Sequence, residues 1–129
     1  MARGRVKVFF DGGSRPNPGP MEAAVVARGV VHLFDDLGVG TNNDAEWLAL
    51  ISALELAWSL GLERPELIGD ALPVIRQANL VLANPETART SPAPDSFLPL
   101  VAAVAPARIR WIKREQNLAG IALAARHPR

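Results

Sequence analysis

An apolar run meets a carboxylate and then a rigid turn in residues 6–20, which read Val6-Lys7-Val8-Phe9-Phe10-Asp11-Gly12-Gly13-Ser14-Arg15-Pro16-Asn17-Pro18-Gly19-Pro20. Runs of β-branched and aromatic residues bounded by Gly and Pro predict a buried or half-buried strand. The pattern therefore places Asp11 where the first strand leaves the core. A carboxylate at that point either bonds its own backbone in the turn or acts as a fixed ligand for a cation, and residues 6–20 leave both readings open.

Length and composition indicate an ordinary globular protein. The 129 residues are enough for a hydrophobic core that is stable without disulfide bonds or structural metals, so we expect a single domain over residues 1–129. A net charge of +1 gives no general attraction to nucleic acid, so such binding would need a local patch. No apolar run reaches the roughly 18 residues of a membrane span, and the N-terminus lacks the apolar segment of a signal peptide. We therefore expect a cytoplasmic protein without a membrane partner.

The residue types restrict the chemistry of any metal site. There is no cysteine, and the histidines are His32 and His127 alone. Thiolate sites are excluded, and this scarcity of histidine argues against a zinc centre or a Ser-His triad. A metal site would be built from oxygen ligands, which suits Mg²⁺ or Mn²⁺.

The next segments predict more of the sheet and then a long helix. Two β-rich runs, 21–29 and 30–37, predict antiparallel strands that follow the first one. Residues 44–60 have helical spacing and are apolar almost all round, which is typical of a central helix. Asn43 is placed to be its N-cap, with Glu46 three residues later in the capping-box position.

The second half predicts a crossover and a mixed sheet. A strand at 66–69 follows the long helix, so it should run parallel to an earlier strand. Further elements are expected as helices at 71–82, 96–105 and 117–126, a loop at 84–95 and a strand at 108–113. We predict an α/β fold with a mixed five-stranded sheet, three antiparallel strands and then parallel strands, flanked by helices on both faces.

Three acidic residues stand at related positions in this layout. Asp11 ends the first strand, Glu46 opens the long helix and Asp70 follows the strand at 66–69. Each has a purely structural explanation, as turn residue, capping-box partner and N-cap respectively. Strand ends and helix starts gather at one edge of such a sheet, where ligands usually bind. Clustered carboxylates there favour a hard divalent cation.

The motifs around these acids resemble the type 1 ribonuclease H family. They are Asp11-Gly12-Gly13-Ser14-Arg15-Pro16-Asn17-Pro18-Gly19-Pro20, Thr41-Asn42-Asn43-Asp44-Ala45-Glu46, Gly69-Asp70 before a helix, and Arg114-Glu115-Gln116-Asn117. The resemblance covers nearly the whole chain in order and spacing, and it implies a ribonuclease H-like fold. It also implies an endoribonuclease that hydrolyses the RNA strand of RNA–DNA hybrids with two divalent metal ions.

The resemblance also assigns roles to residues. It implies that Asp11, Glu46 and Asp70 are the catalytic residues and metal ligands, for Mg²⁺ or Mn²⁺. It implies that the partner is an RNA–DNA hybrid, whose 2′-hydroxyls and sugar edges suit Asn and Ser side chains. The substrate-binding residues carried over are Gly12, Gly13, Ser14, Asn17, Asn42 and Asn43, with Arg76 and Gln77 as weaker candidates.

The sequence departs from the family at a fourth acid. The family usually carries a carboxylate four residues after the asparagine that matches Asn117, and here that position is Ile121. We expect a weakened second metal site and reduced activity, with Glu115 and His127 as the residues that could partly substitute. An alternative is a catalytically degenerate ribonuclease H-like domain that binds nucleic acid or a protein without turnover. A third reading, a nuclease acting on DNA or junctions, fits the acids but not the Gly-rich and Thr-Asn-Asn motifs.

Overall fold

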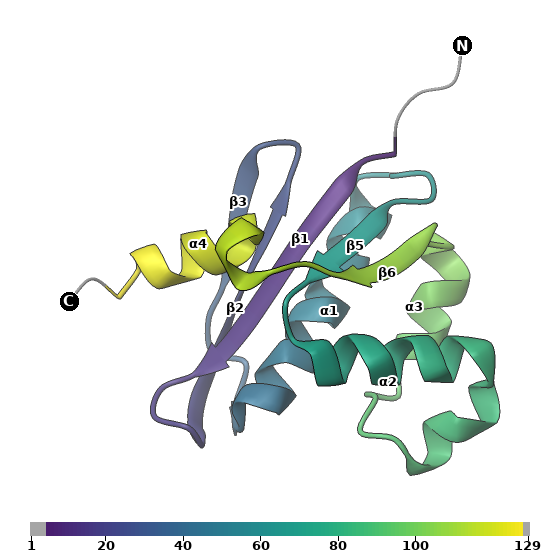
Figure 1. Cartoon of the computed structure of the whole chain (residues 1–129), viewed down its shortest axis with the longest axis horizontal. Coiled ribbons are helices and arrows are strands. Elements are labelled where there is room, and N and C mark those ends of the chain that lie inside the picture. The colour runs from purple at the N-terminus through teal and green to yellow at the C-terminus, as the bar shows by residue number, and fades with distance from the viewer. Residues whose placement is uncertain (1–4, 128–129) are drawn as a thin grey trace.

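The sheet is mixed, and strand β1 (Lys7–Ser14) runs through its middle (Figure 1). The computed structural model describes residues 5–127, so both ends of the expected domain, residues 1–4 and 128–129, lie outside the described residues. The strand order is β3-β2-β1-β5-β6. Strands β2 (Gly19–Ala27) and β3 (Val30–Phe34) are antiparallel to their neighbours, whereas β5 (Glu66–Gly69) and β6 (Arg108–Trp111) pair in parallel. The predicted five-stranded arrangement is confirmed.

Helices cover both faces of the sheet, as predicted (Figure 1). One face carries α1 (Asn42–Ser59), α2 (Leu72–Ala83) and α3 (Phe97–Val104), and the other carries α4 (Leu118–Ala125). Three short elements were not expected: the two-residue strand β4 (Val39–Gly40) beside β2, and the 3₁₀ turns η1 (Pro85–Thr90) and η2 (Arg114–Gln116). Turn η1 lies inside the segment expected to be a loop, because 3₁₀ turns leave no periodic apolar pattern.

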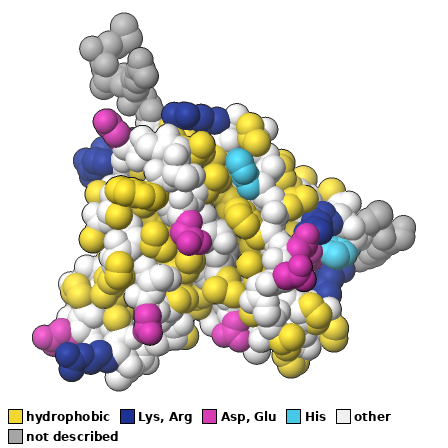
Figure 2. Space-filling model, turned by 180° about the vertical axis from the view of Figure 1, so that it is seen from behind, with side chains coloured by type: hydrophobic (Ala, Val, Ile, Leu, Met, Phe, Trp, Pro, Cys, Tyr) yellow, Lys and Arg dark blue, Asp and Glu magenta, His cyan; other side chains and the backbone are white. Residues whose placement is uncertain are grey.

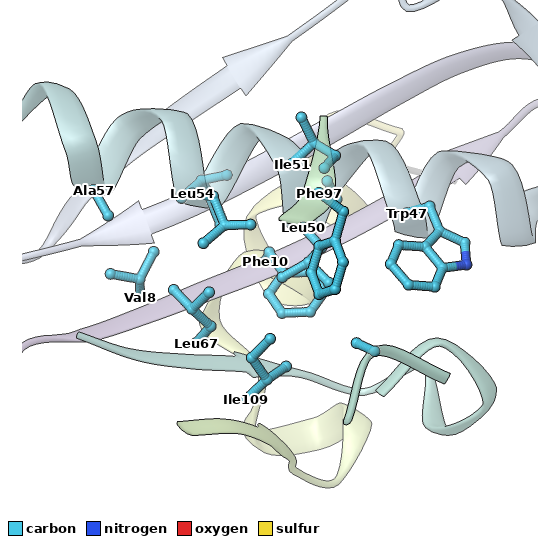
Figure 3. Close-up of a cluster of buried hydrophobic side chains, with 14 of the residues drawn as sticks. Val8, Phe10, Trp47, Leu50, Ile51, Leu54, Ala57, Leu67, Phe97 and Ile109 are labelled. Carbon is cyan, nitrogen blue, oxygen red and sulfur yellow. The ribbon is translucent and has the colours of Figure 1, made fainter. Parts of the chain in front are cut away.

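The larger core lies between the sheet and α1 (Figure 3). Phe10 of β1 is fully buried there, and the rings of Trp47 and Phe97 meet edge to face with centroids 5.3 Å apart. Helix α1 is central, as its apolar circumference predicted, because it packs against β1, β2 and α3 together. This packing holds the start of α1 at a set position beside β1.

A smaller apolar cluster holds α4 on the opposite face. It consists of Ala24, Val26, Ala119 and Leu123, with Phe9 and Ala122 partly buried beside it. The small alanines allow the helix to lie close to the sheet. Within residues 5–127 no helix combines the length and the apolar character that crossing a membrane requires.

Candidate active site

Asp11 lies within strand β1. The sequence had instead predicted that Asp11 would end this strand. The strand continues to Ser14 because β2 pairs with it along the whole Gly-rich segment, and Asp11 lies opposite Ala24. Its side chain is only 3% exposed, and it takes part in no turn. The turn-residue explanation for this carboxylate is therefore wrong, because an antiparallel partner extends the strand through glycines that carry no strand propensity.

Glu46 does not take the capping-box role that the sequence allowed. The N-cap of α1 is Thr41 and not Asn43, and its hydroxyl accepts a hydrogen bond from the backbone N–H of Asp44. The Asp44 carboxylate accepts one from the N–H of Thr41 in return, which completes the capping box two residues earlier than expected. Buried Glu46 instead accepts a hydrogen bond from the N–H of Gly12 at 2.9 Å. This bond joins the start of α1 to the residue after Asp11.

Asp70 does not cap a helix either. The N-cap of α2 is Ala71, which makes no side-chain capping bond. One Asp70 oxygen accepts a hydrogen bond from the Asn117 amide at 2.8 Å, and the same amide donates to the Phe10 carbonyl at 3.0 Å. The indole N–H of Trp111 donates to the backbone carbonyl of Asp70 at 3.1 Å. Asp70 is thus held by Trp111 of β6 and by Asn117 at the start of α4, and Asn117 is itself bonded to β1.

The three acids converge, as predicted. One oxygen from each of Asp11, Glu46 and Asp70 lies within 4.8 Å of the other two. One Asp11 oxygen, Oδ1, is buried and has no hydrogen-bond partner among the described residues. A buried carboxylate oxygen normally has a donor or a cation beside it. The set therefore fits a hard divalent ion, which takes oxygen ligands and would neutralise the clustered charge.

Electrostatics inside the cluster favour protonation when no metal is bound. Burial, and then the neighbouring Asp70 carboxylate, raise the pKa of Asp11 to about 6 from an ordinary 3.8. Burial, followed by Asp11 and Asp70, raises the pKa of Glu46 well above its usual value. Arg114 acts in the opposite direction on Asp11, and its guanidinium lies 3.7 Å from an Asp70 oxygen. Such shifts are typical of carboxylates arranged to bind a cation.

A cavity of about 330 Å³ opens at the cluster. Asp11 and Glu46 form one side of it, and Arg114 reaches it from η2. The remaining lining residues are Gly12, Gly13, Ser14, Arg15, Glu22, Asn42, Leu123 and Ala124. Polar groups of both signs at one concave surface are suited to a charged ligand with hydrogen-bonding edges.

Comparison with known proteins identifies the family. The profile of the reverse transcriptase-like family matches residues 22–127. Among solved structures, RNase H1 of the halophilic archaeon Halobacterium salinarum NRC-1 superimposes with a TM-score of 0.75 at 33% identity, covering 93% of this chain and 94% of that one. The chain belongs to the ribonuclease H family.

Further ribonucleases H support the same assignment. LC11-RNase H1, isolated from compost, superimposes with a TM-score of 0.69 at 28% identity, over 94% of this chain and 93% of that one. A second structure of LC11-RNase H1, in complex with an RNA/DNA hybrid, gives a TM-score of 0.62 at 27% identity, with coverage of 88% and 89%. Ribonuclease HI of Halobacterium salinarum is 43% identical over 83 residues, which are 57% of this chain but only 40% of that protein. The match thus spans less than half the length of this relative.

The residues that the ribonuclease H resemblance assigned to substrate lie in two groups. Ser14, Asn17 and Asn42 are joined, since the Asn42 side chain accepts from the Ser14 N–H at 2.9 Å and Asn17 accepts from the Asn42 N–H at 3.0 Å. Asn43 is exposed in the first turn of α1, next to this group. Arg76 and Gln77 lie on α2 and do not line the cavity, and Gln77 accepts a hydrogen bond from buried Trp47.

The two glycines after Asp11 differ in what surrounds them. A Cβ on Gly12 would lie 2.2 Å from the backbone oxygen of Ala45, so this glycine makes room for α1. A Cβ on Gly13 would meet nothing closer than the Asn42 side chain at 3.9 Å. Of these two glycines, Gly13 leaves open space on the cavity side. Gly12 must lack a side chain because the backbone of α1 packs against it.

Helix α4 brings no carboxylate to the cluster. A Cβ on Gly120 would lie 3.4 Å from an Asp70 oxygen and 3.6 Å from an Asp11 oxygen, so the backbone itself borders the acids there. Ile121 follows and is 53% exposed. Three residues that matter at this edge were absent from the sequence-based assignments: Asn117, which orients Asp70, and Arg114 and Glu22, which line the cavity. The Arg114-Glu115-Gln116-Asn117 motif was a signal for the first two, and nothing local marked Glu22.

Proposed function

We propose that this chain hydrolyses the RNA strand of RNA–DNA hybrids, using Mg²⁺ or Mn²⁺ held by Asp11, Glu46 and Asp70. The observation that carries the proposal is the convergence of these carboxylates in a chain of the ribonuclease H family, with a buried Asp11 oxygen that no described residue partners. Bound divalent ions would supply Lewis-acid stabilisation of the phosphate and a more acidic water. The structure of LC11-RNase H1 in complex with an RNA/DNA hybrid supports the substrate class.

The chain's own residues contribute placement and recognition. Gly12 and Asn117 hold Glu46 and Asp70 in orientation through their hydrogen bonds, so the ligand oxygens face one another before metal arrives. Ser14 and Asn42 line the cavity and Asn17 is bonded to Asn42, which gives a polar group with hydroxyl and amide edges suited to 2′-hydroxyls. Arg114 places a positive charge beside Asp70, where it would meet a phosphate.

The proposal is tested with a labelled RNA–DNA hybrid, the same RNA as a single strand, and a DNA duplex, each with Mn²⁺, Mg²⁺ or a chelator. We expect metal-dependent cleavage of the RNA in the hybrid alone. Glu46→Gln is the control, because glutamine still accepts the Gly12 hydrogen bond but lacks the charge. It should lower the rate by roughly a hundredfold or more. Wild-type activity no higher than this variant would overturn the proposal, and cleavage of duplex DNA would favour the DNA or junction nuclease.

A second candidate is a domain that binds without turnover, and the observation favouring it is that α4 offers no acid at Ile121 or Gly120. Activity below that of a family member with four carboxylates is part of the main proposal for the same reason. Ile121→Asp separates the two. If the remaining site is competent, the variant should bind Mn²⁺ about tenfold more tightly and cleave faster.

The matched control for this change is Leu118→Asp. Leu118 is a similarly exposed apolar residue on α4, but it borders a different hollow beside Lys7 and Phe9. Calorimetric titration with Mn²⁺ and the hybrid assay measure both variants. A gain confined to Ile121→Asp supports a competent nuclease site, whereas hybrid binding without turnover in every variant supports the binding domain.

A further inference from the structure

We infer that Glu22 of strand β2 supplies a fourth carboxylate to this site, in place of the one that α4 lacks. The inference rests on the proposed metal-dependent function and names an additional ligand for it. Glu22 lies outside the three acids and outside every set that the family resemblance assigned. Three features of the fold support its role: the strand face it occupies, the cavity it lines and the way its carboxylate is held.

The register of β1 and β2 puts Glu22 on the same face of the sheet as Asp11. Asp11 pairs with Ala24, and Gly13 pairs with Glu22. Directly opposite residues share a face, and so do residues two apart along a strand. Asp11 and Glu22 are therefore diagonal neighbours, a relation in which Cα atoms lie roughly 7–8 Å apart and long side chains reach each other. Gly13 lies on the same face, next to both Asp11 and Glu22, and carries no side chain.

The cavity at the acidic cluster is lined by Glu22 as well as by Asp11 and Glu46. Helix α4 contributes Leu123 and Ala124 to the same cavity, and neither offers an oxygen ligand. Among the described lining residues, Glu22 is thus the carboxylate besides Asp11 on the α4 face of the sheet, the side on which the resemblance places the family's fourth acid. Glu22 and helix α4, which carries Ile121, lie on the same face of the sheet.

Cationic groups that follow α4 hold the Glu22 carboxylate, which is only 12% exposed. One oxygen lies 3.1 Å from the Arg126 guanidinium, and the other is bonded to the His127 ring. Figure 2 shows acidic, basic and histidine side chains gathered beside the C-terminal end. Arg126 also makes two bonds to Asp35, at 2.8 and 3.1 Å, so it stays paired when Glu22 turns away. Arg15 lies 3.9 Å from the same carboxylate, so Glu22 gives up these ion pairs when it turns towards Asp11, and a bound cation would replace them.

The buried oxygen of Asp11 is the independent sign that a ligand belongs here. Oδ1 has no hydrogen-bond partner among the described residues, which is costly for a carboxylate unless a cation completes its surroundings. Three carboxylates shared by two ions leave coordination positions that waters, a substrate phosphate or a further carboxylate can fill. Rotation of Glu22 towards Asp11 adds carboxylate oxygens from a diagonal neighbour.

The competing explanation is that Glu22 serves only to fasten the end of α4, and two variants separate the explanations. Glu22→Gln removes the charge with little change in shape. Asp35→Asn removes charge from the same Arg126 cluster, but Asp35 does not line the cavity of the acids. Both are measured in the metal-free full-length chain, by calorimetric titration with Mn²⁺ without substrate and by thermal unfolding in a chelator.

We expect Glu22→Gln to weaken the second Mn²⁺ by about tenfold or more, and Asp35→Asn to bind Mn²⁺ as the wild type does. Unchanged Mn²⁺ binding in Glu22→Gln overturns the inference. Equal losses in both variants overturn it too, because they would trace the effect to anchoring of α4. A wild type that binds no Mn²⁺ would overturn the proposed function as well, whereas Asp11-dependent binding that ignores Glu22 overturns only this inference.

Discussion

Asp11→Asn is expected to abolish cleavage of an RNA–DNA hybrid and, in the absence of metal, to stabilise the folded protein. The loss of activity should be roughly a thousandfold or more, because Asp11 is one of the three carboxylates of the proposed metal site. The gain in stability follows from the same position. Asp11 is buried beside two other carboxylates, so its charge opposes folding when no cation is bound.

The pH dependence has a definite sign. The pKa of Asp11 is about 6 in the folded protein and near 3.8 in the unfolded chain, so the folded state binds more protons between these values. Stability of the metal-free protein therefore falls as pH rises from about 4 to about 6, by at most roughly 3 kcal/mol from this group. Glu46 acts in the same direction. Asp11→Asn removes the contribution of Asp11 to this loss of stability. The variant should therefore exceed the wild type in stability by the full amount at pH 7.5.

Thermal unfolding of the wild type and of Asp11→Asn at several pH values, with chelator and with Mn²⁺, measures these differences in stability. Mn²⁺ should raise the Tm of the wild type but not that of Asp11→Asn, since binding to the folded state stabilises it by mass action. Asp35→Asn is the matched control. Asp35 is paired with Arg126, and that pairing lowers its pKa, so neutralising it should give no gain in stability and no loss of cleavage. An Asp11→Asn variant that is less stable than the wild type in chelator would contradict the electrostatic account.

Gly12→Ala is expected to unfold or severely destabilise the protein, by about 3 kcal/mol or more. A Cβ at this position would lie 2.2 Å from the Ala45 oxygen and 2.5 Å from its carbonyl carbon. Both belong to the backbone of α1, so no side-chain rotation relieves the clash. Separation of β1 from α1 would also break the hydrogen bond from the Gly12 N–H to Glu46.

Gly13→Ala is the matched control for this substitution. The same methyl group, one residue later, would meet nothing nearer than the Asn42 side chain at 3.9 Å, so the free energy of unfolding should change by less than about 1 kcal/mol. Urea denaturation of both variants gives the comparison. Similar stabilities for the two would show that β1 and α1 are not packed as closely as the structure indicates.

Much of the fold could be predicted because it rests on local periodicity. The run of β-branched and aromatic residues at 6–10 and the apolar circumference of residues 44–60 reflect burial of a strand and of a central helix, so both elements were found within a few residues of their bounds. Helix caps and strand ends were predicted less well. Thr41 and not Asn43 caps α1, because several adjacent polar residues are equivalent N-caps in sequence and only the backbone path selects one.

The candidate site, like the fold, was predicted from the sequence only in part. The sequence by itself determined the residue types: oxygen ligands without cysteine, three acids in family motifs, and an aliphatic Ile121 where a fourth acid is usual. Only the tertiary structure decided that Asp11 lies inside a strand and that Gly12 is a packing residue. It also placed Glu22 diagonally across from Asp11, in the same cavity. Strand register and the approach of α1 depend on contacts between residues far apart in the chain, and such contacts leave no local pattern at either partner.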